Sequence, residues 1–379
     1  MARTIIDLSI LHTVPPSNMN RDDTGSPKTA VYGGVRRARV SSQAWKRAAR
    51  DAFARYLDRS ELGVRTKRVV ELLADEIRRQ NDAIDEETAV DLATQCLGTA
   101  GIKLTKARGS SDDNPLLDES GYLLFLSTRQ IERVAAAAVS AHASNDPKAA
   151  IKAAKVKTLL NQEHSIDVAL FGRMIADVTD LNVDAAAQVA HAISVHPVET
   201  EFDFFTAVDD HKRADEEEDA GASMIGTVEF NSSTLFRYAT VDVDALQRNL
   251  GDADATKRAV EAFVQAFVRS MPSGKQNTFA NGTLPDAVVI AVRDTQSVNP
   301  VGAFEKAIVS NSRIGDAAVK LAEQAQLTDE AYGTTPVKAW VARASTSAEP
   351  LDALGERAPL DDAVASLGTL VATRLAENK

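Results

Sequence analysis

Residues 20–50 read NRDDTGSPKTAVYGGVRRARVSSQAWKRAAR and combine turn residues, a glycine pair and closely spaced basic side chains. From Arg21 to Arg50 there are eight Lys or Arg residues and two Asp residues, a local charge of +6, whereas the whole chain carries −11. At a Debye length of about 8 Å in physiological salt, acidic groups elsewhere are screened from this patch. The segment therefore predicts a surface for an anionic partner on an otherwise acidic molecule.

The composition indicates a globular chain without a disulfide framework. Its 379 residues are 44% hydrophobic and include one cysteine, Cys96. No Cys or His cluster has metal-ligand spacing, so we expect no metal and no cofactor. The N-terminal residues lack the apolar core of a signal peptide, and no apolar run is long enough to span a bilayer. We expect a cytoplasmic protein with no membrane contact.

Period-two and helical patterns alternate along the chain. Residues 4–13 have the alternation of a strand, and Ser41 or Ser42 is placed to cap a helix whose core side includes Trp45. Further on we expect strands at 165–170 and 227–243, a helix at 185–192 and an acidic loop at 203–221. Strands interleaved with helices, without a Gly-rich nucleotide loop, predict an α+β fold with an antiparallel core of the split βαβ, RNA-recognition type.

The chemistry of residues 20–50 is suited to phosphates. Gly33 and Gly34 allow backbone N–H groups to come close to an anion, and Arg and Lys supply charge-assisted hydrogen bonds without reading bases. Lys46 and Arg50, four residues apart, share one helical face. The alternative is a solvated basic helix face with no ligand.

Five ordered motifs resemble the CasC family, the backbone subunit of the type I-E CRISPR Cascade. The N-R-D-D, G-G-x-R-R and S-S-Q-x-x-K-R-A elements of that family are present within residues 20–48. The likeness continues through IDVALFGRM (166–174), AHAISVHPVETEFDFFTAVDD (190–210), GTVEFNSSTLFRYA (226–239) and GKQNTFA (274–280). Residues 60–160 and those beyond about 325 match weakly.

The resemblance implies a right-hand shape with a modified RNA-recognition-motif (ferredoxin-like) palm, a helical insertion and a β-hairpin thumb. On this chain the palm would be 1–59, 161–200 and 225–325. The fingers would be 60–160, the thumb with its acidic loop 200–225, and a C-terminal helical region 326–379.

The resemblance also implies a function. Copies of such a subunit assemble along the spacer of a CRISPR RNA, kink it at regular intervals and present it for pairing with target DNA in antiviral defence. The implied partners are the CRISPR RNA, target DNA by way of the guide, other copies of the chain, and the large, small, head endonuclease and tail subunits of Cascade.

Site residues follow from the matching positions. The predicted RNA-binding residues are Arg21, Lys28, Arg36, Arg37, Lys46, Arg50, Lys275 and Gln276. Met174 would be an apolar wedge beside the kink, although by itself a Met in this context is more often ordinary core. Candidates for target-strand contacts are Lys148, Lys152, Lys155 and Lys157. The acidic run 215–219 departs from the family pattern.

Two other functions remain open at this point. A metal-dependent ribonuclease could use Asp22 or Asp23, but we expect Arg21 to pair with these carboxylates or to orient them beside RNA. Four of the six histidines, His164, His191, His196 and His211, fall among carboxylates but in no recognised catalytic motif, and we expect His191 and His196 to be structural. The second alternative is a filament protein that binds no nucleic acid. We expect no enzymatic activity.

Overall fold

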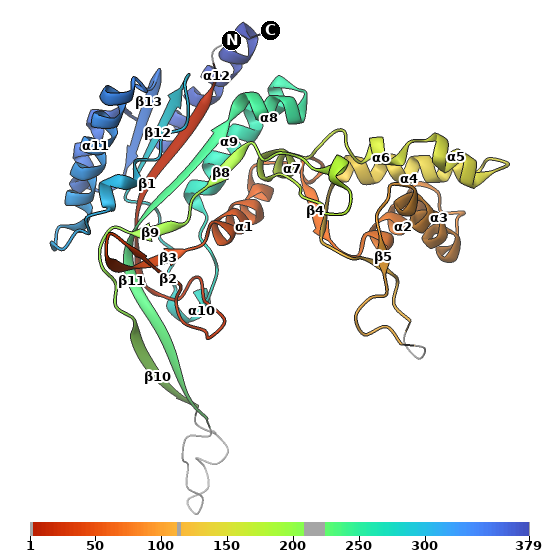
Figure 1. The fold of residues 1–379 in the computed structure, drawn as a ribbon, viewed down its shortest axis with the longest axis horizontal. Coiled ribbons are helices and arrows are strands. Elements are labelled where there is room, and N and C mark those ends of the chain that lie inside the picture. Colours follow the sequence, from red (N-terminus) through yellow and green to blue (C-terminus); the bar gives the residue numbers. More distant parts are fainter. Residues whose placement is uncertain (1–2, 112–114, 208–223, 379) are drawn as a thin grey trace, which may run out of the picture. The chain divides into compact units, whose positions relative to one another are not determined.

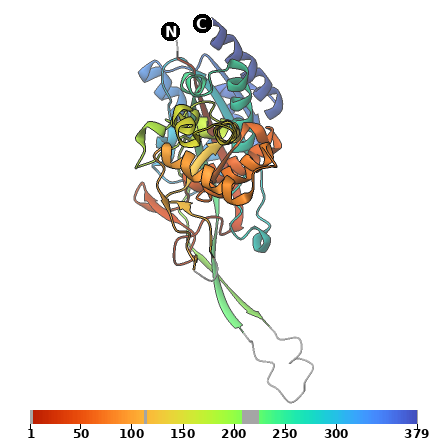
Figure 2. The ribbon, with the colours of Figure 1, turned by 90° about the vertical axis from the view of Figure 1, so that its right-hand side faces the viewer.

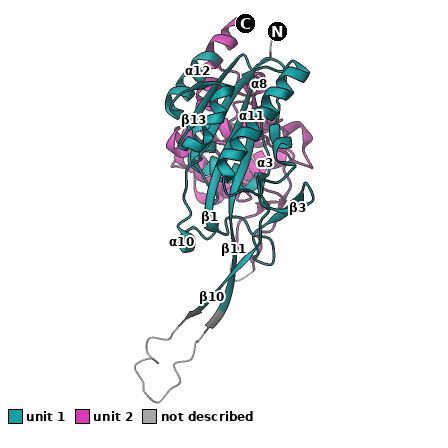
Figure 3. Ribbon diagram, turned by 90° about the vertical axis from the view of Figure 1, so that its left-hand side faces the viewer, with its two compact units in different colours: residues 1–52, 189–240, 263–370 teal, residues 53–188, 241–262, 371–379 magenta. Residues whose placement is uncertain are grey.

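The computed structural model describes residues 3–111, 115–207 and 224–378, and the chain divides into two compact units (Figure 3). Unit 1 comprises residues 1–52, 189–240 and 263–370. Unit 2 comprises residues 53–188, 241–262 and 371–379. Among the described helices, none is long and apolar enough to cross a membrane.

A ten-stranded sheet is the centre of unit 1. Its order is β14-β13-β12-β1-β11-β9-β3-β2, and β8 and β10 also pair with β11. The strands are β1 (Ile5–Ser17), β2 (Thr29–Tyr32), β3 (Val35–Val40), β8 (Ala187–Val189), β9 (Ala192–Ser194), β10 (Glu201–Ala207), β11 (Met224–Asp242), β12 (Ala287–Arg293), β13 (Lys338–Arg343) and β14 (Glu356–Arg357). Most of the described strand pairings are antiparallel, and β13 with β14 is parallel. The expected α+β class is confirmed, with a mixed sheet.

Strand β1 is buried on both of its faces. Successive side chains of β1 point to opposite faces of the sheet. Leu11 packs in the apolar cluster that contains Ala317 and Leu321 of α11. His12 points to the other face, where its ring lies 6.4 Å from that of Trp45 in α1. Helices α11 and α1 therefore lie over opposite faces of the sheet, as Figure 1 shows.

The helices of unit 1 are α1 (Ser42–Ala52), α10 (Gln276–Phe279) and α11 (Arg313–Tyr332), and α9 (Ala253–Arg269) and α12 (Leu360–Glu377) lie partly in it. Two 3₁₀ segments, η5 (Pro300–Phe304) and η6 (Thr346–Leu354), flank α11. Helix α1 forms because Trp45, Ala49 and Ala52 give it one apolar stripe.

A buried guanidinium holds α1 against the sheet. The Arg237 guanidinium of β11 is 3.7 Å from the ring centroid of Trp45 and 4.7 Å from that of Phe267 in α9. It donates to His12 Nδ1 at 3.0 Å and to the Phe267 carbonyl. Within the described residues no carboxylate pairs with it, and burial lowers its pKa to about 9. Cation–π contact is therefore the main compensation for its charge.

Strands β10 and β11 form a long antiparallel hairpin that extends away from the rest of unit 1 (Figure 2). Phe202 and Phe204 are 62% and 74% exposed. The Phe205 ring covers Gly226 on the partner strand, where a Cβ atom would lie 2.3 Å from the ring. This hairpin therefore presents aromatic side chains to solvent.

Unit 2 is mainly helical. It contains α2 (Val69–Gln80), α3 (Glu86–Thr99), α4 (Thr128–His142), α5 (Pro147–Ala153), α6 (Val156–Leu159), α7 (Ile166–Phe171) and α8 (Val243–Leu250). Two short strand pairs accompany them: β4 (Gly63–Thr66) with β7 (Leu124–Ser127), and β5 (Leu104–Thr105) with β6 (Glu119–Ser120). One apolar cluster, including Leu73, Leu92 and Val134, joins α2, α3 and α4.

Several expected elements are confirmed and three are wrong. The strands at 4–13 and 227–243 and the helix after Ser41 are present. Residues 166–171 are helix α7 instead of a strand, and residues 187–189 are strand β8 instead of part of a helix. The expected acidic loop begins later than residue 203, because β10 continues to Ala207, and its run 215–219 lies outside the described residues.

We predict that Trp45→Ala lowers the unfolding free energy by about 3–5 kcal/mol, because it leaves a cavity and removes one π face from the buried Arg237. Chemical denaturation followed by circular dichroism measures the loss. Tyr332→Ala, at a side chain that is 78% exposed, serves as the control and should change stability by less than about 0.5 kcal/mol. Equal effects of the two substitutions would contradict the assigned role of Trp45.

Candidate nucleic-acid interface

The loop between β1 and β2 is closed by its own backbone. Lys28 N donates to the Asn20 carbonyl at 2.9 Å, and Arg21 forms an isolated bridge with Pro27. Inside the loop, Asp22 Oδ1 accepts from the backbone N–H groups of Thr24 and Ser26, each at 3.0 Å. Main-chain bonds therefore fix the positions of Arg21 and Lys28.

Helix α1 is tied to this loop through its first residues. Asn20 Oδ1 accepts from Ser41 N at 2.8 Å, and Ser41 Oγ accepts from Ala44 N at 3.3 Å. With Trp45 buried, Lys46 and Arg50 lie on a half-exposed face of the helix. Partial burial lowers the pKa of the Lys46 ammonium.

The segment 274–280 is tied to the same loop. A Cβ atom on Gly274 would lie 2.2 Å from the Met19 carbonyl oxygen, so only glycine allows this close approach. Lys275 and Ala280, at either end of α10, have left-handed backbone conformations with φ of 50° and 47°. The fold thus gathers three segments in unit 1, which we call the basic site: residues 18–28, α1 and 274–280.

Six of the predicted RNA-binding residues lie on the basic site: Arg21, Lys28, Lys46, Arg50, Lys275 and Gln276. All six are exposed or half-buried. Together with the net local charge, this makes the basic site a surface on which a polyanion can meet several cations at once.

Arg37 is not available to a ligand in this structure. It is fully buried, and its guanidinium donates to the carbonyls of Tyr32, Ser194, Phe304 and Glu305 at 2.8–3.2 Å. The predicted RNA contact of Arg37 is therefore wrong for this conformation, because the residue supports the sheet instead.

Gly33, the first residue of the Gly33–Gly34 pair, makes a close contact within the chain that the sequence did not indicate. A Cβ on Gly33 would lie 1.6 Å from the Glu305 carbonyl oxygen, so the close approach at Gly33 is to the chain itself. Arg36 is exposed beside this turn, opposite Val31 in the β2–β3 pairing. It lies at the end of the hairpin that is farther from Lys28.

The sequence did not reveal a second small group of basic side chains next to Lys28. Arg39 Nε donates to the Thr29 carbonyl at 3.2 Å, and its Nη1 lies 3.1 Å from His191 Nδ1. Desolvation, together with the charges of Arg39 and Lys28, lowers the pKa of His191. The two residues are 152 positions apart, so only the β3–β9 pairing reveals their contact.

The expected pairing of Arg21 with Asp22 or Asp23 is wrong: no ion pair joins them in the described part of the chain. Asp22 instead organises its own loop, and the hydrogen bonds from Thr24 and Ser26 lower its pKa. No group of three His, Cys, Asp or Glu residues among those described could hold a metal ion.

Two of the histidines have clear structural partners. His196 is buried and its Nδ1 lies 2.7 Å from the Pro197 carbonyl, while its Nε2 accepts from Thr234 N. His164 lies against Gln130, and burial lowers its pKa to about 4. His211 lies outside the described residues.

Met174 belongs to unit 2 and is 86% exposed. The alternative of an ordinary core methionine is therefore wrong. Its neighbour Arg173 is buried and donates to the carbonyls of Leu181, Phe125 and Leu160, which fixes the backbone before it. The Met174 side chain is therefore exposed to solvent next to a backbone segment that Arg173 holds in place.

The lysine candidates of unit 2 lie on or beside α5 and α6. Lys148, Lys152 and Lys155 are exposed, and Lys155 has a left-handed backbone with φ of 52°. Lys157 forms an ion pair with Asp180 at 2.5 Å. Three of the four charges are therefore open to solvent, and a target-strand contact stays a prediction.

Comparisons with known proteins give consistent matches. The model of the family described as CT1975-like protein matches residues 6–366. A chain of a solved structure titled "CRISPR RNA-guided surveillance complex, pre-nicking" is 36% identical with a TM-score of 0.83, and the match covers 97% of this chain and 99% of that chain. A chain of a second, titled "CRISPR RNA-guided surveillance complex", is 31% identical with a TM-score of 0.73 and the same coverage. A search of curated proteins gave no match.

We predict that the stability of the fold falls below pH 6.5 through His12, which lies beneath α1. Burial and the Arg237 charge lower the pKa of His12 to about 3. The unfolded chain takes up this proton below pH 6.5 and the folded chain does not, so the stabilisation is complete above pH 6.5 and is lost as the pH falls toward 3. By pH 5 the loss is about 2 kcal/mol.

Denaturation at pH 7 and pH 5 tests this for the original chain and for His12→Gln, which has no titrating imidazole. The difference in stability between the two chains should shrink or reverse at pH 5. If the unfolding free energies of the two chains change equally between pH 7 and pH 5, the pKa of His12 is not lowered in the folded protein.

Proposed function

This chain belongs to the CT1975-like protein family, and we propose from that premise that it binds CRISPR RNA as the backbone subunit of a surveillance complex. The observation that carries the proposal is the basic site. Loop 18–28, α1 and 274–280 are drawn together by the Asn20 side-chain bond to Ser41 N and by the close backbone approach at Gly274. They share six exposed or half-buried basic or amide side chains. Similarity to chains of two CRISPR RNA-guided surveillance complexes supports the same conclusion.

The site favours backbone recognition over base reading. Lys and Arg on three separate segments suit successive phosphates, which repeat along any RNA whatever its sequence. A guide RNA changes its spacer sequence from one target to another, so a subunit that carries it must bind without sequence preference. The left-handed Lys275 backbone and the closed loop around Arg21 keep these cations in place before RNA arrives.

The finer features of the proposal come from the resemblance to the type I-E CasC family. We assign the sheet of unit 1 to an RNA-recognition-type palm, helices α2–α6 to the fingers, and the β10–β11 hairpin to the thumb. Copies of the chain would stack along the spacer and kink the RNA at each thumb. The exposure of Met174, and of Phe202 and Phe204 on the hairpin, supports an apolar contact with displaced bases.

The proposed role is that of a scaffold without catalysis. Asp22, the carboxylate that best suits a ribonuclease alternative, is already hydrogen-bonded to Thr24 and Ser26 within its loop. A carboxylate used in this way holds the loop that carries Arg21.

We predict that Lys46→Glu with Arg50→Glu weakens binding of the full chain to a single-stranded RNA by at least about tenfold. It should also reduce the slope of log K against log salt by about 0.7 for each lost phosphate contact. Fluorescence anisotropy over a series of salt concentrations gives both quantities.

The matched control is Lys306→Glu with Lys320→Glu, which changes the net charge equally. Lys306 is exposed, and Lys320 lies on α11, on the other face of the sheet. This control should keep most of its affinity. Equal losses in the two double variants would mean that only total charge matters and that the basic site is misplaced.

We predict no RNA cleavage when the purified chain is incubated with RNA and Mg²⁺ or Mn²⁺. Gel electrophoresis of end-labelled RNA over several hours gives the readout, with Asp22→Ala and Asp23→Ala prepared in parallel. Metal-dependent cleavage that disappears in either variant would replace the scaffold role with a nuclease.

A further inference from the structure

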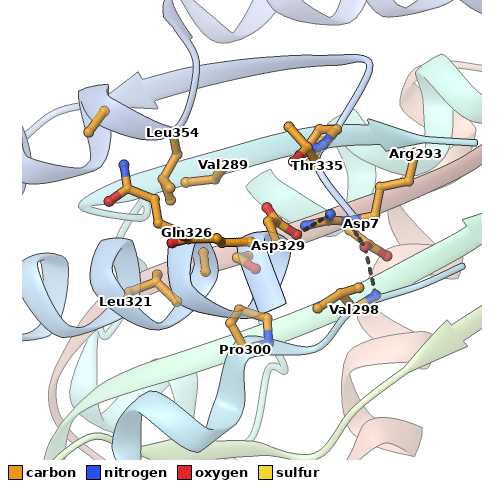
Figure 4. A pocket seen from close by; sticks show the side chains of 16 residues that line it. Asp7, Val289, Arg293, Val298, Pro300, Leu321, Gln326, Asp329, Thr335 and Leu354 are labelled. Carbon is orange, nitrogen blue, oxygen red and sulfur yellow. Dashed lines mark hydrogen bonds and ion pairs between the residues drawn. The ribbon is translucent and has the colours of Figure 1, made fainter. Parts of the chain in front are cut away.

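A cavity of about 370 Å³ lies on the face of the unit 1 sheet that carries α11. Its walls come from β1, β12, α11 and the segments around η5 and η6 (Figure 4). The volume falls in the range of about 300–1,000 Å³ that small-molecule sites occupy. The basic site lies on α1 and its neighbours, over the opposite face, so this cavity is separate from the proposed RNA contacts.

One end of the cavity is polar. Arg293 Nε donates to Asp7 Oδ2 at 3.0 Å, and Arg293 Nη1 donates to Asp329 Oδ1 at 2.6 Å and to the Thr334 carbonyl. Asp7 is held further by the Tyr238 hydroxyl at 2.7 Å and by Val298 N at 2.9 Å. These bonds fix the polar groups before any ligand enters.

The charge at this end is negative. Two carboxylates, Asp7 and Asp329, face one guanidinium, Arg293, and Glu330 adds an exposed carboxylate to the lining. Because two acids already flank Arg293, an anionic ligand would meet an excess of negative charge. A cation would meet a favourable field in a partly desolvated place.

Two polar groups of the lining keep hydrogen-bonding capacity. Ser9 is only 9% exposed and lines the cavity, so its hydroxyl borders the space that a ligand would fill. Asp329 uses Oδ1 for both Arg293 and Thr334, which leaves its Oδ2 as an acceptor. Each of these two oxygens can accept a hydrogen bond from a cationic ligand in the cavity.

The other end is apolar. Leu321, Val289 and Leu354 line it, and Figure 4 shows them apart from the Asp7, Arg293 and Asp329 end. We propose that this cavity binds a small amphipathic amine, with its ammonium group at the carboxylate end and its apolar body against Leu321, Val289 and Leu354. The ammonium would donate to Asp329 Oδ2 and to Ser9 Oγ.

Three probes of one shape test the charge preference: 4-phenylbutylamine, 4-phenylbutanol and 4-phenylbutyrate. Isothermal titration with the full chain at pH 7 should show that the amine binds at least about tenfold more tightly than the alcohol, and that the carboxylate does not bind. Equal affinity for amine and alcohol, or binding of the carboxylate, would overturn the proposal.

Ala325→Leu tests the location. Ala325 lines the cavity from α11, and leucine keeps the helix while it fills the space, so amine binding should fall by at least about tenfold with thermal stability kept or raised. Ala331→Leu is the same change at an exposed position of the same helix and should bind like the original chain. Full binding by Ala325→Leu would place the amine elsewhere and overturn the proposal.

Glu330→Gln tests whether the negative charge at the polar end of the cavity attracts the amine. It leaves the buried ion pairs undisturbed, because the Glu330 side chain is exposed. Amine affinity should drop several-fold and alcohol affinity should stay the same, whereas Glu323→Gln, an exposed control on α11, should change neither. A Glu330→Gln chain that keeps its full preference for the amine counts against the assigned ammonium position.

The same alkylammonium group can come from a free amine or from a lysine side chain of another protein chain. RNA-dependent assembly of the chain, followed by sedimentation with and without saturating 4-phenylbutylamine, separates the two sources. Inhibition by the amine, together with weaker assembly of Ala325→Leu in the absence of the amine, identifies a side chain; unchanged assembly in both cases, together with amine binding, identifies a free amine. RNA binding itself should be the same in Ala325→Leu, so a failed RNA experiment and a failed amine experiment are distinguishable.

Discussion

The buried guanidinium of Arg237 is the constraint on which the rest of unit 1 depends. A cation removed from water without a carboxylate is costly, and here two aromatic faces, one carbonyl and one imidazole nitrogen replace its hydration. These groups come from β1, α1, β11 and α9, so the requirement to surround one charge fixes four elements at once. Because Trp45 must face Arg237, Lys46 and Arg50 must face away from it, and His12 must stay neutral.

The basic site is assembled by main-chain bonds, by one side-chain bond from Asn20 and by a close backbone approach at Gly274. Loop 18–28 is closed by main-chain bonds, joined to α1 through Asn20 and to segment 274–280 through the close approach of Gly274. Asp22 accepts hydrogen bonds from the loop's own N–H groups, and among the described residues it forms no ion pair with Arg21.

Sequence patterns predicted the parts of the fold that local periodicity determines. The first strand, the helix after Ser41 and the long β11 strand are present, because each has a clear period and a clear start. Residues 165–170 were mistaken for a strand because a short apolar run suits either structure. Arg37 is predicted to contact RNA because it belongs to the basic, family-like segment 20–50, but the carbonyls that hold it in the interior lie more than 150 residues away in the sequence. The Arg39–His191 contact and the Arg237 cluster are equally nonlocal.

Strand β1 links the two proposed sites and also keeps them apart. Its odd-numbered residues, Asp7 and Ser9, line the cavity beneath α11, whereas His12 lies with Arg237 and Trp45 beneath α1. A shift of one residue in the β1–β12 register would exchange the two sets and destroy both sites. In the observed register, a substitution on one face of β1 does not contact the residues on its other face. Opposite faces of one strand can therefore carry two separate functions, one for a polyanion and one for a small cation.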